Sequence, residues 1–138
     1  MILLDTDMLT LLLQGDPRVQ KRMRSAETDV ATTIVTWMEV MQGRFRAIFT
    51  AAAADQLERA SQRFQESASQ LSSLPIVPIN RAVAEQFAAL LANKKLKRIG
   101  RGDILIASIA LAEKAKLVTR NIRDFSLVPK LTWENWAD

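Results

Sequence analysis

Four acidic residues stand at places where a parallel α/β sheet would present its ligands. Asp5 follows the apolar run Ile2–Leu4, and Glu39 follows a second predicted strand. Asp124 comes after a later strand, whereas Asp103 begins a long apolar segment. Open parallel sheets bind ligands beyond the carboxyl ends of their strands, where helix N-termini meet. We therefore expect these four residues to converge at one edge of the sheet.

Such a convergence is electrostatically costly. Asp5 and Asp103 adjoin residues that must be buried, and an ionised carboxylate at the rim of a core is unfavourable without a counter-charge. Three or four carboxylates also repel one another. A divalent cation removes this penalty, and oxygen ligands favour Mg²⁺ or Mn²⁺. The pattern thus indicates an acidic pocket that holds one or two of these ions.

The composition of the chain narrows the possible chemistry. Its 138 residues include no His and no Cys, which excludes a disulfide, a thiolate zinc site, a cysteine nucleophile and a Ser-His triad. A metal-activated water needs no His, because the cation itself lowers the pKa of the water. Hydrolysis of a phosphodiester bond fits this set of residues.

The net charge is consistent with an anionic substrate. The chain has 19 Lys and Arg residues against 15 Asp and Glu residues, a formal net charge of +4. This is a mild bias toward anionic partners, and an ordinary solvated surface explains it equally well. The residues that we expect to contact substrate phosphates flank the acids Asp103 and Asp124. They are Arg98, Arg101, Arg120 and Arg123.

Each acid also has a purely structural explanation when it is taken alone. Asp5 can turn the chain, and Asp103 can cap the helix that follows it. Thr36 and Glu39 have the spacing of a capping box, which accounts for Glu39 without any metal. Asp124 can pair with a neighbouring arginine. Only jointly do the acids favour a metal site.

Short apolar runs alternate with segments that have apolar residues at helical spacing. The runs indicate buried parallel strands, and the longer segments indicate amphipathic helices. This alternation is typical of one α/β domain, residues 1–138, with a mainly parallel sheet of about five short strands. The predicted strands are 2–4, 29–33, 76–77, 117–119 and 131–133.

Capping and breaking residues set the expected helix boundaries. Asp7 is predicted to cap the first helix, and Thr36 to open a helix that Gly43 ends. Gly100 and Gly102 are expected to form a flexible turn. The remaining predicted helices are a basic one after Pro17, a long amphipathic one from about Thr50 to Leu71, one capped by Asn80, and a buried one over Ile104–Ala115. The apolar face of the long helix is expected to pack within the molecule rather than against a partner.

Nothing in the sequence resembles a signal peptide, and no apolar run approaches the roughly 20 residues that span a membrane. The longest candidate, Ile104–Ala112, is about half that length and contains Ser108. We therefore expect a soluble cytoplasmic protein.

Four short motifs each join an apolar segment to acidic or polar residues. In chain order they are Ile2-Leu3-Leu4-Asp5-Thr6-Asp7, Val35-Thr36-Trp37-Met38-Glu39, Gly102-Asp103-Ile104-Leu105-Ile106-Ala107, and Leu117-Val118-Thr119-Arg120-Asn121 followed by Asp124-Phe125. In this order the chain resembles the PIN-domain family, and more closely the VapC-type ribonuclease toxins of bacterial toxin–antitoxin modules. The resemblance spans nearly the whole chain.

This resemblance implies a Rossmann-like, three-layer fold and a Mg²⁺- or Mn²⁺-dependent endoribonuclease. It implies that Asp5, Glu39 and Asp103 are catalytic and bind the metal. The fourth acid of the family lies in the loop after the fourth strand, where we assign its role to Asp124 and treat Asn121 as a polar neighbour. The side chains expected to orient carboxylates or the attacking water are Thr6, Thr36 and Thr119.

The resemblance also implies partners. These are the RNA substrate, a second copy of the chain in a homodimer, and a cognate antitoxin whose C-terminal segment lies in the active-site groove. Asp7 stands where the family often has Asn or Ser, so it is not counted as a metal ligand.

Two other functions use some of the same residues. Asp5 and Asp7 also resemble the start of a haloacid-dehalogenase-type phosphatase, in which the first Asp is a nucleophile and the second an acid. The second acid of that family's later motif would fall at Ala107, within an apolar helix. A receiver-like domain fits less well, because Pro78 follows the third strand. A non-catalytic RNA- or protein-binding module on the same fold is the remaining alternative.

Overall fold

Strand β1 (Ile2–Leu4) is the middle strand of a five-stranded sheet in a computed structural model that describes residues 1–138. It pairs with β2 (Val30–Thr33) on one side and with β4 (Lys116–Val118) on the other. The edge strands are β3 (Ile76–Val77) and β5 (Trp133–Glu134), and all neighbours are parallel. The predicted number and direction of the strands are confirmed.

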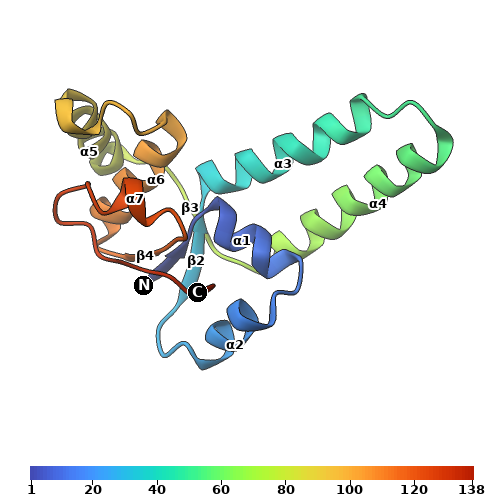
Figure 1. The fold of residues 1–138 in the computed structure, drawn as a ribbon, viewed down its shortest axis with the longest axis horizontal. Coiled ribbons are helices and arrows are strands. Elements are labelled where there is room, and N and C mark those ends of the chain that lie inside the picture. Colours follow the sequence, from blue (N-terminus) through green and yellow to red (C-terminus); the bar gives the residue numbers. More distant parts are fainter.

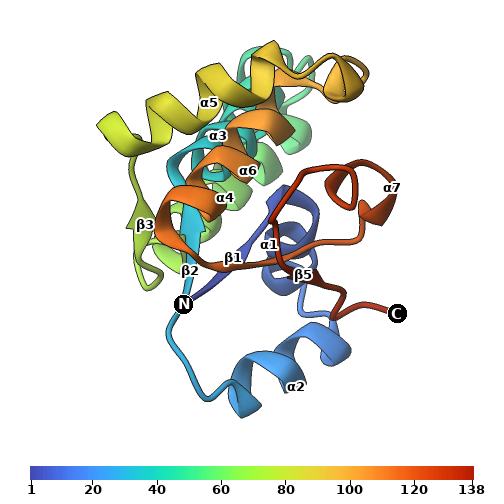
Figure 2. The same cartoon turned by 90° about the vertical axis from the view of Figure 1, so that its left-hand side faces the viewer.

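The alternation of side chains along β1 divides the core into two halves. Leu3 packs with residues of α5 (Arg81–Ala92) and α6 (Arg101–Glu113), whereas Leu4 packs with residues of α1 (Thr6–Leu13). Successive side chains of a strand point to opposite faces of the sheet, so both faces need a covering layer. Figure 2 shows these helices on the two sides of the strands. The predicted three-layer α/β architecture is confirmed.

A helical hairpin made of α3 (Ile34–Phe49) and α4 (Ala54–Leu71) extends from one edge of the molecule (Figure 1). Its two helices pack against each other, and the rings of Phe45 and Phe64 lie 5.4 Å apart. The predicted packing of the long helix against its preceding helix is therefore confirmed for most of its length, but the helix begins at Ala54 rather than at about Thr50, and Leu57 at the start of its apolar face is 48% exposed. Neither these helices nor any other is long and apolar enough to cross a membrane.

Two helix caps differ from those predicted, and both differences affect the site. Asp5, and not Asp7, caps α1, because its Oδ1 accepts a hydrogen bond from the Met8 backbone N–H at 2.9 Å. Thr33, and not Thr36, caps α3, because Thr33 still has an extended backbone. The Thr33 side chain accepts from the Thr36 N–H at 3.0 Å. Helix α3 therefore begins at Ile34, three residues earlier than it would begin with Thr36 as its cap.

Two glycines lie inside helices instead of ending them. Gly43 is an interior residue of α3, and Gly102 is the second residue of α6. Gly100 is the N-cap of α6, which places Asp103 in its first turn rather than at its cap. One glycine costs a helix only about 1 kcal/mol relative to Ala, so packing of the neighbouring apolar residues overrides it. The fifth strand also lies later than predicted, at Trp133–Glu134.

The basic helix and the helix capped by Asn80 begin where they were predicted, whereas two short helical segments were not predicted. The basic helix is capped by Asp16, and Asn80 accepts from the Val83 N–H at the start of α5. A short 3₁₀ turn separates α5 from α6, and a four-residue helix follows β4. The bounds of these elements are α2 (Pro17–Ser25), the turn Lys94–Leu96 and α7 (Ile122–Phe125).

Phe125 anchors the short helix that carries Asp124, because its side chain is fully buried in the core. We expect Phe125→Ala to lower the free energy of unfolding by about 3–5 kcal/mol, through lost burial and the cavity left behind. Urea denaturation followed by circular dichroism measures this loss. Leu127→Ala is the control, because Leu127 is 41% exposed and belongs to the same segment. Equal losses for the two variants would contradict the placement of Phe125.

Candidate active site

The four predicted acids lie on elements whose starts meet beyond the carboxyl ends of the central strands. Asp5 follows β1 directly, Glu39 lies in α3, Asp103 in the first turn of α6, and Asp124 in α7. β1 is hydrogen-bonded to both β2 and β4, so the segments that leave these three strands are neighbours. The parallel sheet thereby brings together residues that are up to about 120 positions apart, and α6, which leads into β4, begins at the same edge.

Asp5 is the most buried of these acids, with 4% of its surface exposed. Burial raises the pKa of its carboxyl from 3.8 to about 6. Hydrogen bonds from the Thr119 hydroxyl and the Met8 N–H lower this pKa, whereas the nearby charges of Asp7 and Asp103 raise it further. The carboxylate is thus held in place by neutral donors and faces other negative charges.

Glu39 is held by a threonine on another helix. The Thr6 hydroxyl donates to Glu39 Oε1 at 2.9 Å, and the Thr6 and Thr36 hydroxyl oxygens are 3.2 Å apart. The capping-box explanation of Glu39 is wrong, because Thr33 is the cap and Thr36 occupies the position where a capping-box acid would be. Glu39 therefore has no role in closing the end of its own helix.

The start of α6 lies close to Glu39 at its second residue, Gly102. A Cβ atom at this position would lie 3.4 Å from Glu39 Oε2, which is ordinary van der Waals contact. The N-terminus of a helix carries partial positive charge, which favours a carboxylate beside it. The glycine that the sequence suggested as a turn lies instead beside this carboxylate.

Asn121 joins the other two acids. Its side-chain amide donates to Asp103 Oδ2 at 3.1 Å and to Asp124 Oδ2 at 3.2 Å. Burial raises the pKa of Asp103, the Asn121 bond lowers it, and the charges of Glu39, Asp124 and Asp7 raise it. The structure thus places both of the residues considered for the fourth position at the site, with Asn121 as the donor that holds two carboxylates.

Basic residues are almost absent from this group of acids. Asp5, Asp7, Glu39 and Asp103 form no ion pair within 4.0 Å, and Asp124 is paired with Arg98 at 3.6 Å. The chain has 19 Lys and Arg residues, so this arrangement does not reflect a shortage of cations. All available ligands are oxygens, which fits a hard divalent cation in donor type and in charge. No three of the acids form a ready-made cluster around one point.

Asp7 belongs to this electrostatic group, which the sequence reasoning missed. Its exposed carboxyl lies in the first turn of α1, and its charge raises the pKa of both Asp5 and Asp103. The sequence does place an acid two residues after Asp5, which could have indicated a role in the site, but Asp7 was interpreted as a helix cap. Once Asp5 caps the helix, Asp7 is free to face the site.

Three of the four arginines predicted to contact phosphate have partners within the molecule. Arg98 pairs with Asp124 and donates to the Arg123 carbonyl at 3.3 Å. Arg101 lies over a phenylalanine ring, and Arg120 pairs with the C-terminal aspartate at 3.8 Å. Only the side chain of Arg123 has no such partner. The predicted phosphate contacts stay predictions.

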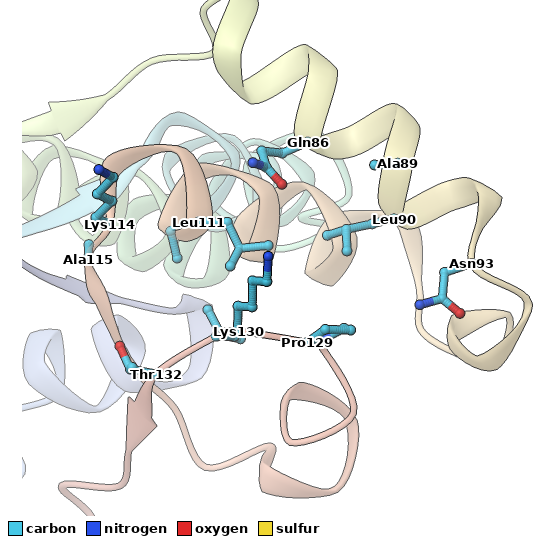
Figure 3. A pocket seen from close by; sticks show the side chains of 12 residues that line it. Gln86, Ala89, Leu90, Asn93, Leu111, Lys114, Ala115, Pro129, Lys130 and Thr132 are labelled. Carbon is cyan, nitrogen blue, oxygen red and sulfur yellow. The ribbon is translucent and has the colours of Figure 1, made fainter.

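A large pocket lies elsewhere. It has a volume of about 560 Å³ and lies between α5, α6 and the segment before β5. Figure 3 shows Leu111 and Lys130 reaching into it, with Asn93 at one end. No acidic residue lines this pocket. The carboxylates therefore do not line this pocket, and their chemistry, rather than the size of a cavity, marks them as the candidate site.

Comparisons with known proteins agree with this fold. Residues 2–131 match the family model of the PIN domain, so the chain belongs to the PIN domain family, as its motifs predicted. Ribonuclease VapC1 of Haemophilus influenzae strain R2866 is 22% identical over 98% of this chain and 97% of its own length. Ribonuclease VapC2 of Rickettsia felis is 58% identical over 38 residues, which is 28% of each chain.

Similar solved structures cover nearly the full chain. One is the crystal structure of VapBC2 from Rickettsia felis bound to a DNA fragment from their promoter, with a TM-score of 0.80 and 25% identity over 99% of both chains. Another is DNA-bound VapBC from Salmonella typhimurium, with a TM-score of 0.79 and 21% identity over 98% of this chain and 97% of that chain. At the lower identity the likeness shows the fold alone.

The raised pKa of Asp5 predicts a pH-dependent stability. The pKa of Asp5 in the folded protein, about 6, lies above the ordinary value of 3.8, so the folded protein binds this proton more tightly than the unfolded chain does. The free energy of unfolding of the protein therefore decreases as the pH rises through 6 and Asp5 becomes ionised. In metal-free buffer, the stability of Asp5→Asn relative to wild type should therefore increase by about 2.4 kcal/mol between pH 4 and pH 7.5. Urea titrations of both proteins at several pH values measure this difference. A difference that stays constant with pH would contradict the burial of Asp5.

Proposed function

We propose that the chain is a Mg²⁺- or Mn²⁺-dependent endoribonuclease and the toxin of a toxin–antitoxin pair. The observation that carries the proposal is that Asp5, Glu39 and Asp103 come together from three distant segments and that none of them has a basic partner within 4.0 Å. Membership of the PIN domain family and the ribonuclease names of full-length relatives support it. The bound cation would lower the pKa of a water molecule and stabilise the leaving oxygen of the phosphodiester.

The residues of the chain position this chemistry. Asp5, Glu39 and Asp103 would hold the cation, with Asp124 beside them, because their carboxylates are the unpaired charges of the site. Thr6 orients Glu39, and Asn121 orients the two acids that it bridges. Without a cation the acids repel an RNA phosphate. A bound divalent cation would reduce this repulsion, and the net charge of +4 favours approach of RNA.

The proposal extends to partners. The similar structures from Rickettsia felis and Klebsiella pneumoniae are a VapBC2 assembly with promoter DNA and a toxin-antitoxin complex. On this support we infer a cognate antitoxin whose C-terminal segment covers the acids, and a homodimer as the working form. Cleavage of RNA and control by an antitoxin are consistent with a cytoplasmic location.

The phosphatase alternative has less support. The position where that family would need its later acid is Ala107, which is fully buried in α6. Asp5 also serves as a helix cap within a buried environment, which leaves its Oδ1 engaged by the Met8 N–H. A binding module without catalysis remains distinguishable by experiment.

The first test of the proposal is metal binding. Mg²⁺ at about 100 times its dissociation constant should raise the free energy of unfolding of wild type by about 2.7 kcal/mol, by linkage. Asp103→Asn should respond by less than half as much, because it removes one charge of the site, and it should exceed wild type in stability without metal. Thermal unfolding with and without EDTA measures both effects.

The control for this test is Asp55→Asn. Asp55 is exposed in the first turn of α4, so this variant loses the same charge outside the site. It should keep the full response to Mg²⁺. Equal metal-free stabilities of wild type and Asp103→Asn would count against mutual repulsion among the acids.

The second test is cleavage of structured RNAs by the purified chain. Cleavage should require Mg²⁺ or Mn²⁺, stop with EDTA, and fall by about 100-fold or more in Asp5→Asn, because one electrostatic group of the site is removed. Gel analysis with mapping of the cleaved ends measures it. A binding module would bind RNA equally well in both proteins and cleave it in neither. Cleavage that persists in EDTA would refute the proposed mechanism.

A further inference from the structure

A second pocket, lined mainly by polar residues, lies where α1 meets the helical hairpin. It has a volume of about 230 Å³, and its walls come from the C-terminal end of α1, from α3 and from α4. In Figure 1, α1 lies beside the part of the hairpin where α3 begins and α4 ends. Leu13 is the only apolar residue among the seven that line the pocket. This pocket is separate from the acids and from the larger cavity.

Two guanidinium groups face this pocket without an acidic partner. Arg44 Nε donates to the Ser67 hydroxyl at 2.9 Å, which leaves both terminal nitrogens of Arg44 free. Arg63 forms no ion pair within 4.0 Å, and neither does Glu66, the single acid of the lining. The side chains therefore carry a net charge of +1, and the donors of two arginines are available to a ligand.

The packing of the hairpin shows that Arg44 is held in position. On α4, the residues that face α3 recur at helical spacing, and the buried ones are Ala60, Ser67 and Leu71. Ser67 is 3% exposed and occupies a place in this stripe where an apolar side chain would pack. Its hydroxyl instead binds Arg44, which is half-buried. Ser67 thus makes a hydrogen bond that fixes the Arg44 guanidinium at the pocket, in place of an apolar contact between the two helices.

This arrangement suits an oxyanion. Guanidinium groups bind phosphate oxygens through two parallel N–H donors, and a guanidinium fixed by a third contact loses less freedom on binding. A lining with a single apolar residue is poorly suited to the apolar face of a protein helix. The free arginines here contrast with those beside the acids, where Arg98, Arg101 and Arg120 are engaged within the molecule.

We propose that the Arg44–Arg63 pocket binds a backbone phosphate of the RNA substrate, at a distance from the bond that is cleaved. This inference rests on the proposed ribonuclease function. Along α3 the step from Glu39 to Arg44 is five residues, a rise of about 7.5 Å, and along α1 the step from Thr6 to Gln14 is about 12 Å. These steps place the bound phosphate within a few nucleotides of the acids along the RNA strand.

The test is RNA affinity in an Asp5→Asn background, which keeps the RNA intact. Arg44→Gln and Arg63→Gln should each raise the dissociation constant of a single-stranded RNA about three- to tenfold at low salt. Each should also reduce the slope of log K against log salt by about 0.7, the value for one phosphate contact on a single strand. Fluorescence anisotropy over a series of salt concentrations measures both quantities.

Arg46→Gln is the matched control. Arg46 is an exposed arginine on the same helix, outside the pocket and without an ion pair, so the variant has the same net charge. Its dissociation constant should change by less than twofold. Ser67→Ala should weaken RNA binding as well, because Arg44 loses its anchor while its charge remains. Thermal unfolding of each variant verifies that the hairpin is folded.

Inorganic phosphate is an independent probe that needs no RNA. In metal-free buffer it should shift the Nε–H resonance of Arg44 in wild type, and this shift should be absent in Arg63→Gln. Unchanged affinity and salt slope in both arginine variants would overturn the inference even if wild type cleaves RNA. Absence of cleavage by wild type would instead refute the proposed function. Loss of antitoxin binding with intact RNA affinity would identify an acidic protein segment as the occupant and overturn the inference too.

Discussion

Repulsion among carboxylates is the constraint on which the rest of this structure depends. The fold brings acids from separate segments to one edge of the sheet, and of these only Asp124 has a basic partner, Arg98. Burial raises the pKa of Asp5 to about 6, and neighbouring charges raise it further. Neutral groups, the Thr6 hydroxyl and the Asn121 amide, hold the other carboxylates in place. Such donors fix geometry without cancelling charge, which preserves the negative potential that a cation site needs.

Burial of apolar residues in the core offsets the repulsion among the carboxylates. Both faces of the sheet are covered, and the almost fully apolar α6 packs into the larger half of the core. That packing fixes the position of Asp103 at the start of the helix. The cationic groups are kept at the periphery or farther away, in the Arg44–Arg63 pocket. Negative charge at the centre and positive charge around it form a pattern suited to a metal ion and a polyanion together.

The sequence predicted much of this arrangement, and the wrong predictions concern residues whose role depends on tertiary structure. The alternation of strands and helices gave the parallel sheet, and the four acids were placed correctly at its carboxyl edge. The starts of two helices were predicted less accurately. Asp7 and Thr36 were predicted as the caps, whereas Asp5 and Thr33 cap these helices in the structure. A cap depends on which backbone is still extended, and that depends on where the preceding strand ends its pairing. Gly43 and Gly102 were misread because packing overrides the modest helix preference of a single glycine.

The sequence by itself determined the chemistry that is available: oxygen ligands without His or Cys, an apolar first strand that ends in Asp5, and a buried helix that follows Asp103. Only the tertiary structure decided which groups meet. It removed Glu39 from the capping box, added Asp7 to the electrostatics of the site, and joined Arg44 to Ser67 across the hairpin. The physical reason is that residue type sets what a side chain can bind, whereas charge interaction depends on distance. Distance between remote segments is fixed only when strands pair and helices pack.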